Sequence, residues 1–211
     1  MSTLIKSDMA NKLKFNSNQR NRGIMRHIGT NTLETERLTL RRFTVDDAED
    51  MYRNLCSDNR VNKFLTWDLH KSIDETIELM KTFEKRYENP ARYCWAIVLK
   101  ESNEVIGTIA APTVKERIEA VEITYAIAFP FWGKGITAEG LKAVMAYLFK
   151  EVGVNRIEAG HDLNNPNSGK VMEKVGMQKE GVLRQAGRNN QGLFDLVMYS
   201  ILRSDNNRVR N

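Results

Sequence analysis

The sequence has few cysteines, histidines and prolines, and it has no long apolar run. Cys56 and Cys94 are its only cysteines, they form no CxxC pair, and only three histidines accompany them in 211 residues. A disulfide framework or a Cys/His zinc site needs more ligands than this, so we expect no metal. No uninterrupted apolar stretch approaches the roughly 20 residues that a membrane-spanning helix requires. These absences, with 41% apolar residues, indicate a globular cytoplasmic protein with one good-sized core.

The formal charge of +5 is confined to the N-terminal segment. Residues 1–30 hold six basic side chains and one acidic one, so the rest of the chain is electrically neutral. This segment shows no helical or strand period and lacks the apolar core of a secretory signal. We expect residues 1–32 to be a flexible basic arm, with Met25 as an alternative start. A solvated tail is the favoured interpretation of the arm, and contact with RNA or ribosomes is the alternative.

Strand and helix patterns alternate between residues 33 and 203, with no linker and no internal repeat. The pattern predicts one α/β domain followed by a polar tail at 204–211. Strands are predicted at 38–43, 93–99, 105–110, 121–128 and 155–162, with the last sheet material near Leu183 and at 193–202. Helices are predicted after Thr44, after Ser72, from a cap at Thr137, and from an opening segment at 164–168 to a glycine stop at Gly176.

The chemistry is predicted to lie where a strand runs through a glycine-rich loop into the helix that begins near Thr137. Gly133 and Gly135 remove side chains where the backbone must turn tightly or approach a ligand closely. The N–H groups beyond them lie at the positive end of the helix dipole, and Lys134 adds a cation. This arrangement predicts a phosphate-binding loop, and the alternative is a simple turn.

A second kind of phosphate site also fits the spacing. Gly133, Gly135 and Ala138 satisfy the G-x-G-x-x-G/A pattern of dinucleotide-binding enzymes. Such a unit starts with a wholly buried apolar strand, whereas Glu122 and Thr124 lie in the strand before this loop. A nicotinamide- or flavin-dependent oxidoreductase is therefore the less favoured alternative.

Residues 33–203 resemble the GCN5-related N-acetyltransferases (GNAT), specifically the branch of ribosomal-protein N-terminal acetyltransferases (the RimJ and RimL type). The likeness rests on the order and spacing of five short motifs: Thr35-Glu36-Arg37-Leu38, Trp132-Gly133-Lys134-Gly135-Ile136, Asn165-Pro166-Asn167-Ser168, Lys174-Val175-Gly176-Met177 and Glu180-Gly181. The resemblance implies an α/β GNAT fold, a mixed central sheet of about six or seven strands with flanking helices. It also implies a V-shaped split between two parallel strands, here 121–128 and 156–162.

The resemblance further implies a site for acetyl-CoA, whose amine acceptor attacks the thioester directly in a ternary complex. A backbone N–H near Ile127 or Ala128 would polarise the thioester carbonyl. Ser168 occupies the position of a serine proposed to protonate the leaving thiolate, and Asn165 that of an asparagine bound to the pantetheine arm. The residues expected at the cofactor are Ile127, Ala128, Phe129, Trp132, Gly133, Lys134, Gly135, Ile136, Thr137, Asn165 and Ser168.

The resemblance assigns no residue of this sequence to the role of general base. The glutamate that some ribosomal-protein members carry on a late strand falls on Gly187 here, and Pro130 stands where the wider family has Arg or Gln. Glu122 matches an acid of the central strand and is our candidate for collecting the amine proton through water. A rim charge or an ion pair is its alternative role. Tyr125 and Tyr199 are interpreted as core aromatics.

The acceptor is the least determined part. Trp67 is expected to line its site, or else to be a buried anchor. A protein N-terminal amine has a reference pKa of roughly 8 against roughly 10.4 for lysine, so it is more often neutral and able to attack. We therefore expect a ribosomal-protein-type N-terminal amine as acceptor, with an antibiotic or polyamine as the alternative. Specific nucleic-acid and membrane partners are not expected, and the enzyme is expected to be a monomer or homodimer.

Overall fold

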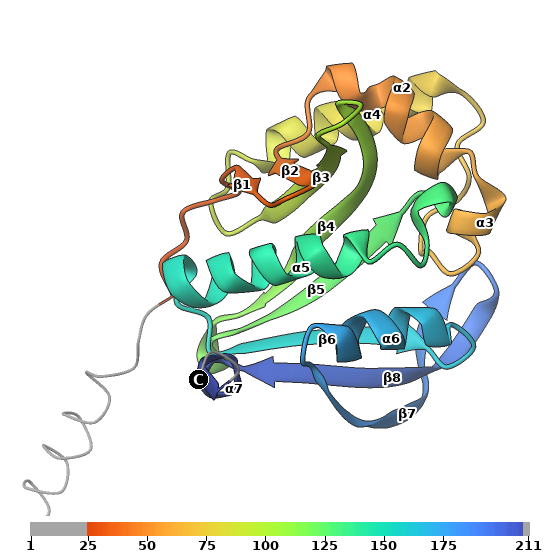
Figure 1. Ribbon diagram of the computed structural model, residues 1–211. Helices are drawn as coiled ribbons and strands as arrows, with labels where there is room; N and C mark the ends of the chain where they lie inside the picture. Colours follow the sequence, from red (N-terminus) through yellow and green to blue (C-terminus); the bar gives the residue numbers. More distant parts are fainter. Residues whose placement is uncertain (1–24, 209–211) are drawn as a thin grey trace, which may run out of the picture.

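The computed structural model describes residues 25–208, which form one eight-stranded sheet with helices on both faces (Figure 1). The strand order is β1-β2-β3-β4-β5-β6-β8-β7. The strands are β1 (Leu33–Glu34), β2 (Leu38–Arg41), β3 (Tyr93–Leu99), β4 (Glu104–Lys115), β5 (Ala120–Ile127), β6 (Arg156–Asp162), β7 (Gln178–Asn189) and β8 (Gly192–Leu202). All neighbours pair antiparallel except β5 and β6, which run parallel.

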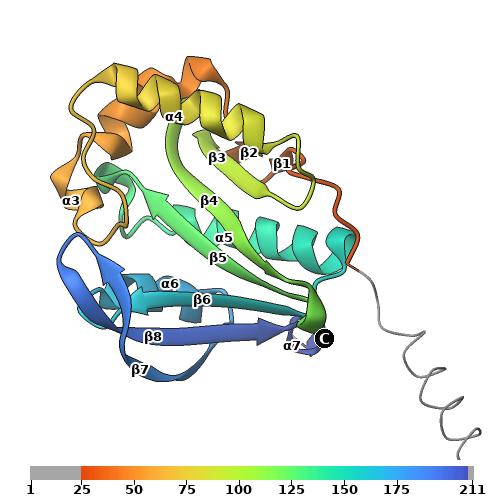
Figure 2. The same cartoon turned by 180° about the vertical axis from the view of Figure 1, so that it is seen from behind.

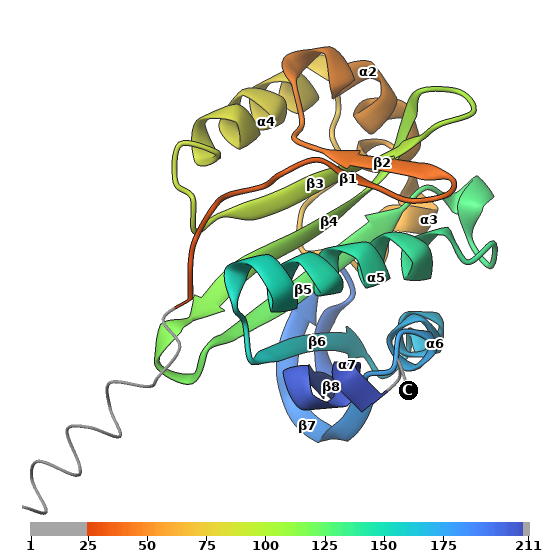
Figure 3. The same cartoon turned by 60° about the vertical axis from the view of Figure 1, so that its left-hand side comes forward.

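Helices cover both faces of the sheet. They are α2 (Ala48–Met51), α3 (Asn59–Asn62), α4 (Ile73–Arg86), α5 (Ile136–Tyr147), α6 (Pro166–Lys174) and α7 (Arg203–Arg208). Because side chains alternate along a strand, β3 serves two cores: Trp95 and Ile97 pack on the face of α5, and Ala96 and Val98 pack on the face of α2 and α4. Figures 2 and 3 show α4 and α2 over the β2–β4 half, with α5 beneath the centre of the sheet.

The sheet splits between β5 and β6. The two strands pair at three positions only, the last of which joins Glu122 to Glu158. Beyond this point β5 stays with β4 as far as Ile127, and β6 stays with β8 as far as Asp162. The two halves therefore diverge into the V expected for residues 121–128 and 156–162, and the predicted GNAT fold is confirmed, with one or two strands more than the number expected.

The helix ends follow their caps with one exception. Ser72 precedes α4, and Gly176, with φ of 88°, follows α6, both as predicted. The cap predicted at Thr137 is wrong, because α5 begins at Ile136 and its N-cap is Gly135 in a left-handed conformation. Thr137 lies in the first turn with its side chain buried.

Residues 25–32, which were expected to belong to the arm, pack against the domain. Met25 is only 4% exposed and lies in the core on the α5 side. The Trp95 indole N–H donates to the Asn31 carbonyl at 2.8 Å. The described fold thus includes this segment, and residues 1–24 of the expected arm lie outside the described residues.

The expected C-terminal tail begins with a short helix. Helix α7 covers residues 203–208, and the Arg203 Nε donates to the Val154 carbonyl at 2.9 Å. Residues 209–211 lie outside the described part of the chain. Among the helices of residues 25–208, none combines the length and the apolar character needed to cross a bilayer.

Candidate active site

The loop between β5 and α5 is shaped by two glycines. Gly133 and Gly135 have φ of 73° and 75°, a left-handed conformation that other L-residues adopt only with strain. A Cβ at Gly133 would meet no atom within 4 Å, and one at Gly135 would lie 3.2 Å from the Lys174 Nζ. The loop therefore presents bare backbone toward open space at Gly133 and toward the Lys174 ammonium at Gly135, as a site for close approach of an anionic ligand requires.

The N–H groups of this loop and of the first turn of α5 are available to a ligand. Within residues 25–208, no backbone or side-chain acceptor receives a hydrogen bond from the N–H groups of Gly133, Gly135, Ile136, Thr137 or Ala138. The first intrahelical bond of α5 runs from Glu139 N to Gly135 O at 3.1 Å. These donors lie at the positive end of a 12-residue helix, which is an anion-binding arrangement.

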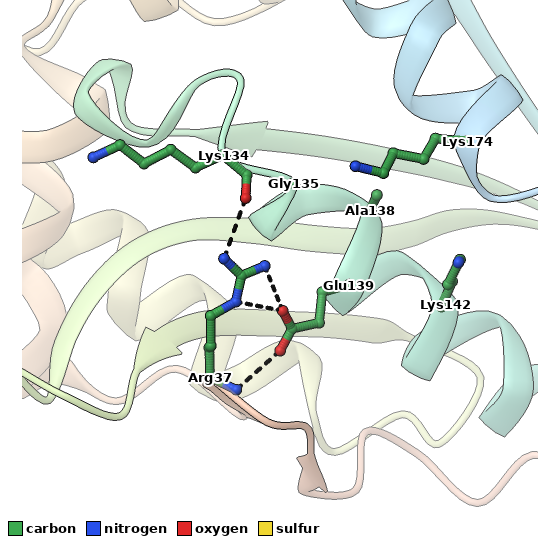
Figure 4. A pocket seen from close by; sticks show the side chains of 7 residues that line it. All are labelled: Arg37, Lys134, Gly135, Ala138, Glu139, Lys142 and Lys174. Atoms are coloured by element: carbon green, nitrogen blue, oxygen red, sulfur yellow. Dashed lines mark hydrogen bonds and ion pairs between the residues drawn. The ribbon is translucent and has the colours of Figure 1, made fainter.

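Three cationic side chains surround a hollow of about 290 Å³ beside this helix end. They are Arg37 from the segment before β2, Lys142 from α5 and Lys174 from α6. In Figure 4 the side chain of Lys134 points away from the hollow, and its Nζ lies 5.4 Å from the Phe131 ring centroid. The Lys134 carbonyl instead accepts from Arg37 Nη1 at 3.2 Å.

Glu139 fixes Arg37 at the edge of the hollow (Figure 4). Its carboxylate accepts from the Arg37 Nε at 2.7 Å, from the Arg37 backbone N–H at 2.9 Å and from the Thr35 hydroxyl at 2.6 Å. Burial would raise the pKa of Glu139, but the hydrogen bonds from Thr35 and Arg37 together lower it. Glu139 is therefore a charged anchor. Lys142 and Lys174 form no ion pair within residues 25–208, so these two cations of the hollow can meet an anion.

Prediction from the sequence missed these cations. Lys142 stands four residues after Ala138 and so lies on the same side of α5 as the loop, a spacing that could have identified it. Lys174 reaches the hollow only because α6 packs beside α5, and local sequence gives no such signal.

The two backbone amides proposed near the split differ in availability. The Ala128 N–H donates to the Ile106 carbonyl at 2.8 Å, and Ile127 lies opposite Gly107 in the ladder. Because successive residues of an antiparallel strand direct their N–H groups to opposite sides, the Ile127 N–H points into the gap toward β6 and the Ala128 N–H does not. The Ile127 carbonyl accepts from the Trp132 indole at 2.8 Å.

Phe129 and Trp132 form an exposed aromatic corner at the wide end of the gap. Each side chain is 41% exposed, and their ring centroids are 5.1 Å apart. The Arg60 guanidinium from α3 lies 4.1 Å from the Phe129 centroid. Pro130 occupies the short 3-10 turn between these aromatics, so it shapes the loop and offers no side-chain contact to a phosphate.

Ser168 and Asn165 lie at the start of α6, on the other side of the gap. Asn165 is the N-cap residue, its backbone N–H donates to the Asp162 carbonyl at 2.7 Å, and its side chain is half-buried. The Ser168 Oγ lies 2.9 Å from the hydroxyl of Tyr125, which extends across from β5. Tyr199 is buried in the core as interpreted from the sequence, whereas Tyr125 is only partly buried and joins the two sides of the split.

Glu122 lies where the gap closes, and its side chain is on the face opposite Tyr125. It shares that face with Ala126, which packs in the core beneath α2 and α4. Its neighbour on β6 is Glu158, whose carboxylate pairs with Lys115 and, at 2.7 Å, with the Arg156 Nε. Among the described residues no ion pair involves Glu122, and the structure does not bring it into contact with Ser168.

Trp67 lies near the wide end of the gap, in a segment bound to the β7–β8 turn. The Asn190 side-chain amide donates to the Trp67 carbonyl at 2.8 Å and to the Asn62 Oδ1 at 2.6 Å, and the Asn190 N–H donates to Leu65 O at 3.1 Å. The Trp67 Nε1 is buried without a hydrogen-bond partner among the described residues. Figures 1 and 2 show the turn beside α3. The two diverging halves of the sheet are thus rejoined at their wide end.

The position expected for a family glutamate is filled by an aromatic ring. A Cβ on Gly187 would come within 2.2 Å of the Phe194 Cζ, because the Phe194 ring lies across the glycine. A carboxylate at this position would require Phe194 to move, so β7 supplies no base here.

Comparison with known proteins agrees with the fold and the loop geometry described above. The family described as "Acetyltransferase (GNAT) domain" matches residues 37–178. The chain is 33% identical over 171 residues to the uncharacterized N-acetyltransferase YoaA of Bacillus subtilis, covering 81% of this chain and 96% of that protein. It is 23% identical over 168 residues to the ribosomal-protein-serine acetyltransferase of Escherichia coli, covering 79% and 93% of the two chains.

A solved structure shares the fold. The Microcin C7 self immunity acetyltransferase MccE, determined in complex with acetyl-CoA and AMP, superposes with a TM-score of 0.71 at 22% identity, covering 80% of this chain and 93% of that one. The free amides and cations described above fit the diphosphate of such a donor. The chain belongs to the GNAT family and is an N-acetyltransferase that uses acetyl-CoA.

Proposed function

We propose that this enzyme transfers the acetyl group of acetyl-CoA directly to the N-terminal amine of a protein. The observation that carries the donor side is the set of free N–H groups at Gly133, Gly135 and the start of α5, beside Lys142 and Lys174. The acceptor side is supported by the similarity to a ribosomal-protein-serine acetyltransferase. The lower pKa of an N-terminal amine, which leaves more of it neutral at pH 7, also supports this acceptor.

The loop residues hold the donor. The N–H groups of Gly133, Gly135 and Ile136 bind the diphosphate, Lys142 and Lys174 neutralise its charge, and the exposed Trp132 and Phe129 flank the entrance to the gap. The thioester arm then lies between β5 and α6, where Asn165 provides a polar contact.

The reacting groups meet in the gap. The amine nitrogen attacks the carbonyl carbon, and the Ile127 N–H stabilises the negative charge that develops on the carbonyl oxygen. The C–N bond forms, the C–S bond breaks, and one proton passes from nitrogen to sulfur. Glu122 takes that proton from nitrogen through water and passes it on through water to the sulfur, while the Ser168 hydroxyl hydrogen-bonds to the leaving thiolate.

The fraction of the amine that is neutral at pH 7 distinguishes an N-terminal amine from a lysine as acceptor. At pH 7 roughly 10% of an amine with a pKa of about 8 is neutral, against about 0.04% of a lysine with a pKa of about 10.4. Gly187 stands where some family members carry a glutamate, so no base at this position offsets the lower neutral fraction of a lysine. The N-terminal amine is thus favoured by about two orders of magnitude before any contact is made.

The test uses matched acceptors. Thiol release from acetyl-CoA is measured with a lysine-free peptide that begins in Ser, with the same peptide N-terminally blocked and carrying one lysine, and with a polyamine. We expect release with the first peptide only. Release with the polyamine or the blocked peptide, and none with the free N-terminus, would refute the proposed acceptor while leaving acetyl-CoA as the donor.

A further inference from the structure

The hydroxyl of Tyr125 joins the two sides of the split sheet. It donates to the Ser168 carbonyl at 2.8 Å and lies 2.9 Å from the Ser168 Oγ. Tyr125 stands three residues beyond the last pair that joins β5 to β6, so its side chain spans the gap where the strands have begun to separate. It contacts the residue proposed to face the leaving thiolate.

The two contacts fix the direction of the Ser168 hydrogen. A phenol carries one hydrogen, and a carbonyl can only accept, so the Tyr125 hydrogen goes to the Ser168 carbonyl. The Ser168 hydroxyl must then be the donor in the second contact, toward the Tyr125 oxygen. One rotation of the Tyr125 O–H moves its hydrogen from the carbonyl to Oγ, because both acceptors lie at nearly the same distance.

We infer that Tyr125 is a positioning residue for Ser168, which it holds in the gap and whose hydroxyl it supports when that hydroxyl turns to the sulfur. This inference rests on the proposed function. When Ser168 redirects its hydrogen to the thiolate, Tyr125 donates to Oγ and offsets the electron density that Oγ gains. Tyr125 keeps its proton throughout, and the proton that reaches sulfur still comes from the amine.

The acidity of the phenol is consistent with a donor and not with a proton source. A tyrosine has a reference pKa of about 10 against about 8.5 for a thiol, so transfer of its proton to a thiolate is uphill. Burial is the main cause that raises the pKa of Tyr125 further.

Helix α6 has other supports, so loss of the phenol oxygen should leave it in place. Met172 is buried in the core, and the Asn165 N–H bonds to the Asp162 carbonyl. The His161 ring lies beneath Gly169, where an added Cβ would approach the His161 Nε2 to 2.6 Å. Phenylalanine at position 125 would keep the ring and remove only the hydroxyl.

The test compares Tyr125→Phe with Ser168→Ala, the double variant and Tyr199→Phe. Tyr199 is the matched control because its hydroxyl also bonds to α6, at Glu173 Oε1 and 3.0 Å, but does not touch Ser168. With a peptide that begins in Ser, we expect Tyr125→Phe to lower kcat about tenfold and to change KM for acetyl-CoA less than about twofold. In the Ser168→Ala background it should have little further effect, and Tyr199→Phe should match the wild type.

A second measurement needs no acceptor. The thiol pKa of bound CoA is followed by ultraviolet titration of the binary complex. A supported Ser168 hydroxyl stabilises the thiolate, so this pKa should lie below that of free CoA and should rise in Tyr125→Phe and Ser168→Ala alike. An unchanged thiol pKa in Tyr125→Phe, or losses of kcat that multiply in the double variant, would overturn the inference. If wild-type enzyme releases no thiol with any amine but the pKa effect is present, the proposed function fails and the contact stands.

Discussion

Replacing Gly135 with alanine separates the conformational role of this glycine from its role in binding. Gly135 has φ of 75°, and an L-residue in this conformation is destabilised by about 1–2 kcal/mol. The new Cβ would lie 3.2 Å from the Lys174 Nζ, a flexible end that can move aside, so the steric part is small. For a domain of this size each kcal/mol lowers Tm by about 2–4 °C, which gives an expected loss of about 2–8 °C.

Gly153 supplies the matched control at the other end of the same helical segment. Its φ is 86°, and an added Cβ would make only an ordinary contact, 3.8 Å from the Arg203 Nη2. Gly153→Ala should therefore lower Tm by a similar amount. Only Gly135→Ala places a methyl group among the loop amides and Lys174, in the hollow proposed for the diphosphate.

The expected effect on binding follows from the loss of one hydrogen bond between a loop amide and the diphosphate, which the added methyl group would push away. A hydrogen bond to a charged group contributes about 1.5–3 kcal/mol, so Gly135→Ala should raise Kd for acetyl-CoA roughly 10- to 100-fold. Gly153→Ala should leave Kd within about twofold of wild type. Kd is measured by titration calorimetry and Tm by circular dichroism. If both variants lose the same Tm and both bind acetyl-CoA normally, these amides do not hold the diphosphate and the reasoning fails.

Three further predictions concern the charges and the ends of the gap. Lys174→Ala should raise Kd for acetyl-CoA and flatten its dependence on salt, measured by calorimetry, whereas Lys134→Ala should change neither, because its ammonium points out of the hollow (Figure 4). Hydrogen bonds from Arg156 are the main cause that lowers the pKa of Glu180 from 4.5 to about 2, so this group's stabilising contribution is complete above about pH 4.5 and is lost as pH falls toward 2. Urea denaturation at pH 5 and pH 2.5 should therefore show a smaller loss of stability in Glu180→Gln than in wild type, and equal losses would contradict the assignment. Asn190→Ala should reduce the free energy of unfolding by about 1–2 kcal/mol, since it removes side-chain bonds between the two halves of the sheet, and a change under about 0.5 kcal/mol would show that this link is weak.

Local patterns predicted the elements that have their own periodicity. Strand β3 occupies the predicted residues 93–99, and the apolar face of α5, with Leu141 and Val144, is buried. Strand β7 was predicted only as sheet material near Leu183, without its bounds, because its side chains are mostly exposed and show no alternation of polarity. Its place in the sheet is set by pairing with β8, which is a tertiary effect. The cap at Thr137 failed because the left-handed Gly135 begins the helix two residues earlier.

The residues of the candidate site also fall into two groups: those that the local sequence identifies and those that only tertiary packing brings together. Gly133 and Gly135 could be identified because their function is local: they let one loop expose its own amides. Lys174 and Tyr125 act across the boundary between chain segments, and only the packing of α6 beside β5 and α5 brings them to the site. The segment from Met25 was assigned to an arm by its charge, and composition could not reveal that Met25 enters the core.

The width of the gap is fixed at three levels, and this bears on how the enzyme works. At the closed end, Lys115 of β4 reaches across β5 to Glu158 of β6. In the middle, Tyr125 bonds to Ser168, and at the wide end Asn190 bonds the β7–β8 turn to the segment that carries Trp67. A thioester arm that enters such a slot loses its own freedom, but the protein does not have to close around it. In the mechanism we propose, the Ile127 N–H and the Ser168 hydroxyl are then already in place when the amine arrives. The proposed direct transfer, which forms no covalent enzyme intermediate, depends on that pre-organisation.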